Sequence, residues 1–245
     1  MEPKLHLERK PCLKLYLKSG AKIVIELWPE AAPNAVNSLI YVASHGWMDR
    51  HAIQRIAPGK WVDLSYNAYG HEECRYLIPD EYRLHPEIDP LTPRPGVICM
   101  GGYDEAGLAS SEIFFPLKDF PEFRGIYPVL GEVIAGMDEI QRIAELPTRE
   151  VIYPGTDKKI LEPAEPQIIE RAELELFGET YPAPVRMEKQ DLPPCWHGGI
   201  VEKTVTWFCT AASFRSAYDR TLCCKSKFPE VLIFASTSGD FCICL

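Results

Sequence analysis

Apolar and polar residues alternate near the start of the chain. Leu13, Leu15 and Leu17 alternate with polar or aromatic neighbours, and a second alternating run at 23–27 follows Gly20. A period of two sends successive side chains to opposite faces of a strand, and a glycine between two such runs is typical of a hairpin turn. The pattern predicts a β-hairpin with one buried face.

A helical period replaces this alternation directly afterwards. Apolar residues recur three and four positions apart, at Val36, Leu39, Ile40 and Ala43. Pro33 stands where a first helical turn tolerates proline, and Gly46 stands where the helix can end. We expect an amphipathic helix that covers one end of a barrel.

The same order of strand and helix recurs later in the chain. A strand-like run at 129–135 leads into a segment with Met137, Ile140 and Ala144 on one helical face, and a last alternating strand ends near residue 176. By contrast, 74–95 is dense in Pro, Asp and Glu without a lasting period, which predicts a long surface loop with at most one strand.

One stretch between these elements has candidate chemistry. Residues 54–63 read Gln-Arg-Ile-Ala-Pro-Gly-Lys-Trp-Val-Asp, which places Arg55 between apolar neighbours, before a Pro-Gly turn and the aromatic Trp61. Such an order can hold one guanidinium against an apolar wall. An arginine seen alone is usually an ordinary surface residue.

Composition and charge narrow the classes of partner. The chain has 245 residues, 46% of them hydrophobic, which suffices for one full core with an additional segment. A formal net charge of −9 argues against nucleic acid or an anionic membrane as the main partner. No run is apolar enough for a signal peptide or a membrane span, so we expect a cytoplasmic protein. We also expect a monomer.

The residues from 189 onwards differ in composition. Six of the nine cysteines lie there, followed by a weakly charged apolar end. Adjacent cysteines at 223–224 and the single-residue gap at 242–244 do not have the usual zinc-ligand spacing, so we expect free thiols and no metal. The segment is interpreted as an extension of two or three strands or a poorly folded tail.

Five blocks of the chain together resemble the cyclophilin-type peptidyl-prolyl isomerases. Besides 54–63, residues 25–33 (Ile-Glu-Leu-Trp-Pro-Glu-Ala-Ala-Pro) are similar to the family's Ile-Glu-Leu-Phe-Pro-Glu-x-Ala-Pro. The other three blocks, in the family's order, are 96–102, 111–115 and 129–138. The resemblance covers about 12–177 and implies a closed antiparallel β-barrel capped by two α-helices. Beyond it, the composition predicts a linker at 178–188 and a Cys-rich extension at 189–245.

The resemblance also implies an activity and a site. It implies that Arg55 is the catalytic donor for rotation about Xaa-Pro bonds in client polypeptides, with no cofactor. The substrate-binding positions that it implies are Trp61, Asp63, Gly101, Gly102, Glu112, Phe114, Phe123 and Tyr127. Each aromatic could equally be a core residue, and for any one aromatic the core is the commoner explanation.

Several positions depart from the family's pattern. Gly101-Gly102 replaces Ala-Asn, Glu112 replaces Gln, and Asp63 stands where the family has the Gln that orients its arginine. A carboxylate at 63 could hold Arg55 through two parallel hydrogen bonds and compete with the substrate. Two hypotheses follow: a slow isomerase, or a non-catalytic module that binds proline-containing peptides in the same groove.

Two other stretches of the chain are weaker candidate sites. Residues 71–74 (His-Glu-Glu-Cys) include metal-ligand types, but they are contiguous and are interpreted as a solvated acidic turn. The glycine-rich stretch at 101–107 lacks the Lys-Ser/Thr pattern of a phosphate-binding loop, and its acidic pair would repel phosphate. Neither predicts a metal or nucleotide site.

Overall fold

The computed structural model describes most of the chain, with several gaps. It describes residues 9–65, 67–103, 107–153, 157–188, 192–193 and 196, and the backbone of 222–225, 232–235 and 241–244. The contacts group the chain into two compact units, Met1–Lys203 and Thr204–Leu245. The first unit contains all five sequence blocks.

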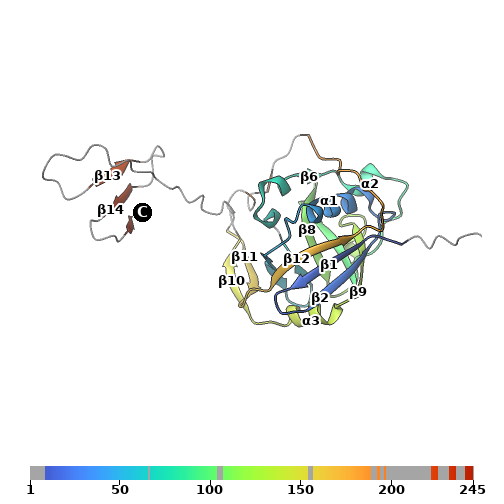
Figure 1. Cartoon of the computed structure of the whole chain (residues 1–245), viewed down its shortest axis with the longest axis horizontal. Coiled ribbons are helices and arrows are strands. Elements are labelled where there is room, and N and C mark those ends of the chain that lie inside the picture. Colours follow the sequence, from blue (N-terminus) through green and yellow to red (C-terminus); the bar gives the residue numbers. More distant parts are fainter. Residues whose placement is uncertain are drawn as a thin grey trace, which may run out of the picture. The chain divides into compact units, whose positions relative to one another are not determined.

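Ten strands form the main sheet of the first unit, and every strand pair is antiparallel (Figure 1). Its order is β3-β12-β1-β2-β9-β7-β8-β5-β4, and β6 pairs with β8 off this path. The strands are β1 Cys12–Leu17, β2 Lys22–Leu27, β3 His51–Ala52, β4 Arg55–Ala57, β5 Trp61–Asp63, β6 Leu77–Ile78, β7 Val97–Gly102, β8 Leu108–Pro116, β9 Val129–Ala135 and β12 Ile168–Glu175.

The sheet curls round into the predicted antiparallel barrel. Its two end strands, β3 and β4, are consecutive in the chain and separated by residues 53–54 alone, so covalent connection brings the ends together where the hydrogen-bonded ladder stops. The predicted hairpin is β1–β2, in which Leu13 pairs with Ile25 and Leu15 with Ile23. All four of these side chains are buried in the barrel core. The alternation in the sequence thus identified the inward face.

Two helices cover the barrel as predicted, and Figure 1 shows them at its opposite ends. Helix α1 spans Pro33–Ser44, with proline in its first turn, and helix α3 spans Met137–Ala144. Beyond the end of α1, Gly46 has φ of 71°, a left-handed backbone that glycine adopts without steric cost. Within the described residues, no helix is long and apolar enough to cross a membrane.

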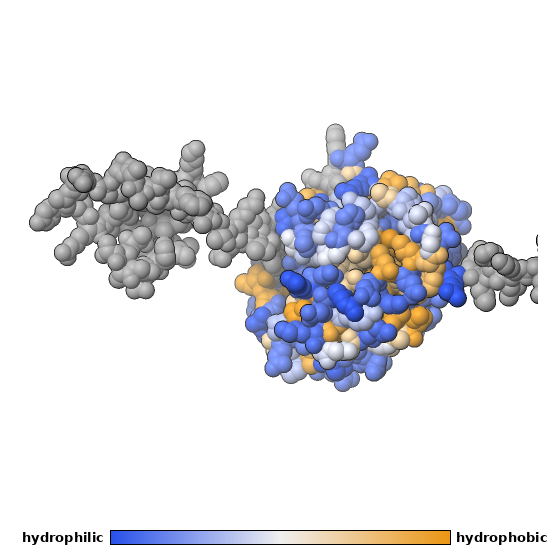
Figure 2. Space-filling model, viewed as in Figure 1, coloured by the Kyte–Doolittle hydropathy of each residue, from blue (hydrophilic) through white to orange (hydrophobic). Residues whose placement is uncertain are grey.

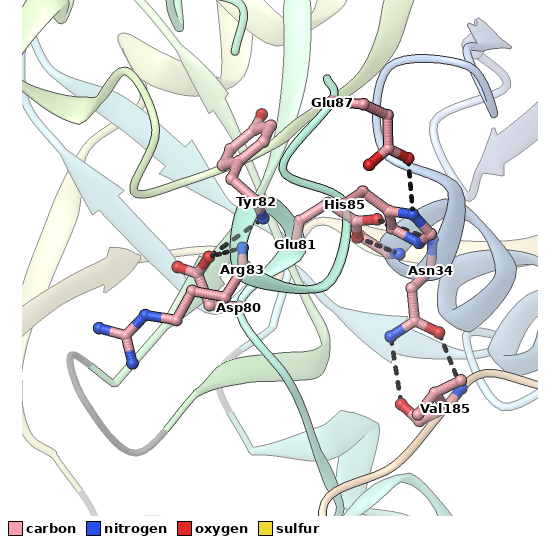
Figure 3. A network of polar contacts seen from close by, with 9 residues as sticks. Asn34, Asp80, Glu81, Tyr82, Arg83, His85, Glu87 and Val185 are labelled. Carbon is pink, nitrogen blue, oxygen red and sulfur yellow. Dashed lines mark hydrogen bonds and ion pairs between the residues drawn. The ribbon is translucent and has the colours of Figure 1, made fainter. Parts of the chain in front are cut away.

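The stretch at 74–95 has the one strand that the prediction allowed and also a short helix that it missed. Strand β6 and a short helix, α2 (Glu81–Leu84), lie there. The Glu81 carboxylate is fully buried and accepts hydrogen bonds from the backbone N–H groups of Asn34 (3.0 Å) and Ala35 (2.7 Å), as Figure 3 shows. These N–H groups open α1 and have no partner within the helix, so a buried acidic residue satisfies them.

A hairpin that no sequence pattern predicted lies beside β4. Its strands are β10 Thr148–Ile152 and β11 Lys159–Pro163, which form a separate two-stranded sheet. Strand β11 packs beside β4, which carries Arg55. The hairpin therefore stands at the edge of the candidate site.

The stretch predicted as a linker, 178–188, makes specific contacts with the barrel. The Asn34 side chain donates to the Val185 carbonyl and accepts from its N–H (Figure 3). Met187 N–H donates to the Leu77 carbonyl. Further along, Trp196 is fully buried within the barrel's hydrophobic core. The packing of the barrel core thus includes a residue beyond 188.

The second unit contains three short strands that form their own antiparallel sheet: β13 Leu222–Lys225, β14 Leu232–Ala235 and β15 Phe241–Cys244. The prediction of free thiols and no zinc for the C-terminal cysteines concerns side chains outside the described residues. In the barrel, Cys12, Cys74 and Cys99 are free.

Candidate functional site

Three adjacent strands align the central residues of the site. Arg55 on β4 lies directly opposite Asp63 on β5, and Asp63 lies opposite Phe114 on β8. Cross-strand partners point to the same face of a sheet, with Cβ atoms roughly 4.5–5.5 Å apart. The register alone therefore brings a guanidinium, a carboxyl group and a phenyl ring into one row.

The same period of two adds a second row. Trp61 precedes Asp63 by two positions on β5, and Glu112 precedes Phe114 by two positions on β8. Residues two apart on a strand share a face, so both side chains point towards the same space as the first row. Five of the predicted residues are thus placed by strand register, with no contribution from loops.

An aromatic wall closes one side of this space. Phe123 ends a short 3₁₀ turn, Pro121–Phe123, and Tyr127 follows it, just before β9. The Phe123 and Tyr127 rings meet edge to face at 4.9 Å, and Phe114 meets Tyr127 at 5.9 Å and 90°. Trp61 lies 6.1 Å from both phenyl rings. These separations are those of favourable aromatic pairs, so the wall is rigid and apolar.

These elements enclose one cavity of about 160 Å³. That volume is well above the roughly 10–15 Å³ that a single water molecule requires. The nine residues predicted from the sequence all line it, together with Tyr103 and Tyr153: the full lining is Arg55, Trp61, Asp63, Gly101, Gly102, Tyr103, Glu112, Phe114, Phe123, Tyr127 and Tyr153. The structure brings the predicted residues together, while their individual roles remain predictions.

The contact between Arg55 and Asp63 differs from the predicted fork. A single ion pair joins Arg55 Nη1 to Asp63 Oδ2 at 3.5 Å. The same oxygen accepts a hydrogen bond of 2.9 Å from the Trp61 indole N–H. The guanidinium carbon also lies 5.4 Å from the centre of the Trp61 ring. Because the indole takes the carboxylate oxygen, the arginine is held by one long contact and by the ring face.

Burial raises the pKa of Asp63 to about 6, while Arg55 and the Trp61 indole lower it. Removing a carboxylate from water disfavours its charged form, and here that cost exceeds the attraction of the arginine. Asp63 therefore changes charge near neutral pH. Its hold on Arg55 weakens as the pH falls through 6.

Glu112 has the stronger perturbation. Burial raises its pKa to about 8, and nearby Asp63 adds to the rise, whereas Arg55 and hydrogen bonds from Tyr103 and Trp196 lower it. The Tyr103 hydroxyl donates to Glu112 Oε1 at 2.6 Å and the Trp196 indole N–H donates to the same oxygen at 2.8 Å. At pH 7 the protonated acid predominates, so Glu112 can donate a hydrogen bond as the family's Gln does.

Glycine at 101 enlarges the polar end of the cavity. A Cβ atom added there would lie 3.6 Å from the Glu112 carbonyl oxygen and 4.0 Å from Oε2, which is ordinary contact. Gly102 is tighter, since an added Cβ would lie 3.1 Å from the Gly107 carbonyl oxygen. A side chain at 101 would fit, and its absence leaves the space in front of Glu112 open.

Sequence reasoning missed Tyr103, Tyr153 and Trp196. Tyr103 directly follows a matching block and could have been found from that position. Tyr153 follows β10, and its hydroxyl lies 3.4 Å from that of Tyr103. Tyr153 and Trp196 lie in stretches without a motif, so only the fold could place them. Within the described ranges, no His, Cys, Asp and Glu side chains form a group of three or more that could hold a metal ion.

Comparison with known proteins identifies the family. Residues 12–173 match the model of the cyclophilin type peptidyl-prolyl cis-trans isomerase/CLD family. The chain belongs to the cyclophilin family. The match includes β1 and ends within β12. It therefore covers the barrel strands, both covering helices and all eleven residues that line the cavity. Trp196 lies outside it.

Similar cyclophilins occur in bacteria. The chain is 29% identical to peptidyl-prolyl cis-trans isomerase B of Bacillus subtilis over 124 residues, which are 50% of this chain and 82% of that protein. It is 25% identical to a probable peptidyl-prolyl cis-trans isomerase of Brucella suis over 142 residues, or 53% of this chain and 69% of that protein.

Two crystal structures have the same fold. A Cryptosporidium parvum cyclophilin type isomerase, solved in the presence of the dipeptide Ala-Pro, has a TM-score of 0.53 at 18% identity, covering 67% of this chain and 98% of that one. The cyclophilin AquaCyp293 from Hirschia baltica has a TM-score of 0.50 at 16% identity, covering 66% and 73%. At these identities the likeness shows the cyclophilin fold.

Proposed function

We propose that the protein is a peptidyl-prolyl cis-trans isomerase that accelerates rotation about Xaa-Pro bonds in client polypeptides. One observation carries the proposal: the cavity places the Arg55 guanidinium beside the wall formed by Trp61, Phe114, Phe123 and Tyr127. An apolar wall suits a prolyl ring, and the guanidinium supplies hydrogen-bond donors next to it.

The chemistry needs no nucleophile. The barrier to rotation, about 18–20 kcal/mol, comes from amide resonance, which is lost when the bond twists. Arg55 can donate a hydrogen bond to the twisted prolyl nitrogen, whose lone pair is available only in the transition state. Such differential binding lowers the barrier, while the aromatic wall holds the ring still as the preceding residue rotates.

A protease-coupled isomerisation assay on a short Xaa-Pro peptide tests this activity. Arg55→Ala should lower kcat/KM by roughly ten-fold or more, equivalent to about 1.4 kcal/mol. Arg94→Ala is the matched control, because Arg94 is an exposed arginine that pairs with Glu132 and does not line the cavity. Equal rates for the unmodified protein and Arg55→Ala would reject an isomerase centred on this residue.

A binding module is the second candidate, and the Arg55–Asp63 ion pair favours it. An arginine engaged by a carboxylate has fewer donors for the transition state. Titration calorimetry with the same peptide distinguishes the two functions. Binding that Trp61→Ala or Phe123→Ala weakens, without measurable isomerisation, would assign the groove to recognition alone.

The compartment is also a proposal. The free thiols of Cys12, Cys74 and Cys99 suit a reducing compartment such as the cytoplasm. Fractionation of cells that produce the protein, followed by immunodetection, tests it.

A further inference from the structure

Residues beyond the last barrel strand contact the barrel, and one of them contacts the candidate site. The segment Val185–Met187 is fixed on the barrel by the paired hydrogen bonds of Asn34 with Val185, at 3.1 and 2.7 Å, which Figure 3 shows. Arg186 places its guanidinium carbon 3.8 Å from the centre of the Tyr76 ring. Figure 2 shows the mixed, mainly hydrophilic surface of one face of this unit. The segment thus has its own anchors before it reaches Trp196.

Trp196 lies inside the protein. Its side chain is fully buried and belongs to the main hydrophobic core. The indole meets the Tyr103 ring edge to face, at 6.0 Å and 85°. Its N–H donates to Glu112 Oε1 at 2.8 Å. An indole needs a partner for its N–H when it is buried, and here the partner is a residue that lines the cavity.

Both hydrogen bonds to the Glu112 carboxyl group end on one oxygen. Tyr103 and Trp196 donate to Oε1, and within the described residues no hydrogen bond involves Oε2. Oε2 lies on the side of Gly101, where an added Cβ would be 4.0 Å away. Two donors from different elements fix the plane of the carboxyl group, because each of them constrains the same acceptor.

The protonation of Glu112 follows from its neighbours. Asp63 and Arg55 face it from β5 and β4, Tyr103 and Trp196 bond to it, and Tyr69 and Tyr153 lie nearby. Burial dominates and raises the pKa of Glu112 to about 8. Since Oε1 already accepts two hydrogen bonds, the proton of the neutral acid belongs on Oε2, where it points towards the open end of the cavity.

We propose that Trp196 is a positioning residue: its indole N–H holds the Glu112 carboxylic acid so that Oε2–H donates a hydrogen bond to a main-chain carbonyl of the bound peptide. The inference rests on the proposed function, because it concerns the same groove and the same ligand. It makes Trp196, which lies after the family-matched region, part of the site.

A double-mutant cycle in the full chain tests this coupling. Trp196→Phe keeps an aromatic ring and removes the N–H. It should raise KM for an Xaa-Pro peptide by about five-fold with little change in kcat, the effect of one hydrogen bond. In a Glu112→Ala background the same change should have no further effect. Trp47→Phe, a partly buried tryptophan that does not line the cavity, is the control and should leave KM unchanged.

A second measurement needs no peptide. The carboxyl ¹³C resonance of Glu112 should titrate at higher pH in Trp196→Phe, because the indole N–H favours the ionised form and its loss raises the pKa. Should that variant fail to fold, the Trp196 indole proton of the unaltered chain serves instead. Its chemical shift should follow the titration of Glu112, and Glu112→Gln should abolish that dependence.

Two results would overturn the inference. Trp196→Phe could raise KM equally with and without Glu112, which would make Trp196 an ordinary core residue. Alternatively, Trp196→Phe could leave the titration of Glu112 unchanged, or Glu112→Gln could leave the pH dependence of the Trp196 indole shift unchanged. Failure of the proposed function looks different: the unmodified protein would neither isomerise nor bind the peptide, whatever residue stands at 196.

Discussion

The chemistry of the two sides of the cavity has different origins. The aromatic side, formed by Trp61, Phe114, Phe123 and Tyr127, consists of rings that meet one another at 4.9–6.1 Å and would be apolar in any setting. The polar side is made of Arg55, Asp63, Glu112 and their partners. Its properties depend on burial, because Asp63 and Glu112 have pKa values raised to about 6 and 8.

This difference shows how substitutions at one site can preserve or change its chemistry. Replacing one apolar side chain by another on the aromatic side keeps an apolar wall, so Trp61, at the position where the family has Met, leaves its character intact. Replacing neutral amides by carboxyl groups on the polar side would introduce negative charge in water. Burial counteracts this, since a neutral carboxylic acid has a donor and an acceptor as an amide does. The polar side therefore resembles the family's in its hydrogen bonding only over a limited pH range.

The largest expected effect is on the aromatic side. Phe114 is 5% exposed and packs in a small core with Val97, Cys99 and Val129. Phe114→Ala should therefore lower the free energy of unfolding by about 3–5 kcal/mol, measured by chemical denaturation. Phe123→Ala, at a half-buried position of the same wall, should cost less stability and weaken peptide binding. Equal losses of stability in the two variants would mean that Phe123, like Phe114, is a core residue.

The second largest effect is the pH dependence of stability that the buried acids of the polar side cause. Raised pKa values of buried acids mean that the native state binds more protons than the unfolded state between about pH 4.5 and 8, so stability should fall as pH rises through this range. Glu112→Gln removes this contribution. At pH 9 the variant should be more stable than the unmodified protein by on the order of 2–4 kcal/mol, with little difference at pH 4.

Thermal unfolding between pH 4 and 9 measures this difference. Glu122→Gln is the matched control, because Glu122 is exposed and lies beside the wall without lining the cavity. It should reproduce the profile of the unmodified protein. A Glu112→Gln profile as steep as that of the unmodified protein would show that Glu112 is ionised in the native state at neutral pH.

The smallest effect concerns the ion pair. Asp63→Asn keeps an acceptor for the Trp61 indole and removes the charge that engages Arg55, so kcat/KM at pH 8 should rise by about two- to five-fold. In the unmodified protein the rate should rise as the pH falls through about 6, where Asp63 becomes neutral, and the variant should lack this step. A lower rate in Asp63→Asn would instead make Asp63 the residue that orients Arg55.

The sequence determined much of the barrel and most of its cavity. Alternation identified the inward residues of β1 and β2, and helical spacing identified α1 and α3, because these patterns follow from local backbone geometry. The motif around Arg55 contains its own strand, turn and strand, so register could place Arg55, Trp61 and Asp63 on one face. Composition also indicated a change of character near residue 189.

The tertiary structure decided the protonation state and the partners of each polar group. A carboxyl group in a sequence has no fixed charge, and only burial against particular neighbours gives Glu112 and Asp63 their raised pKa values and turns Glu81 into a partner for the first N–H groups of α1. Likewise, Trp196 lies 84 residues from Glu112 in the chain, and no periodicity extends that far. Long-range packing and desolvation are properties of the folded whole, so the sequence pattern could name the residues of the site but not their charges or their distant partners.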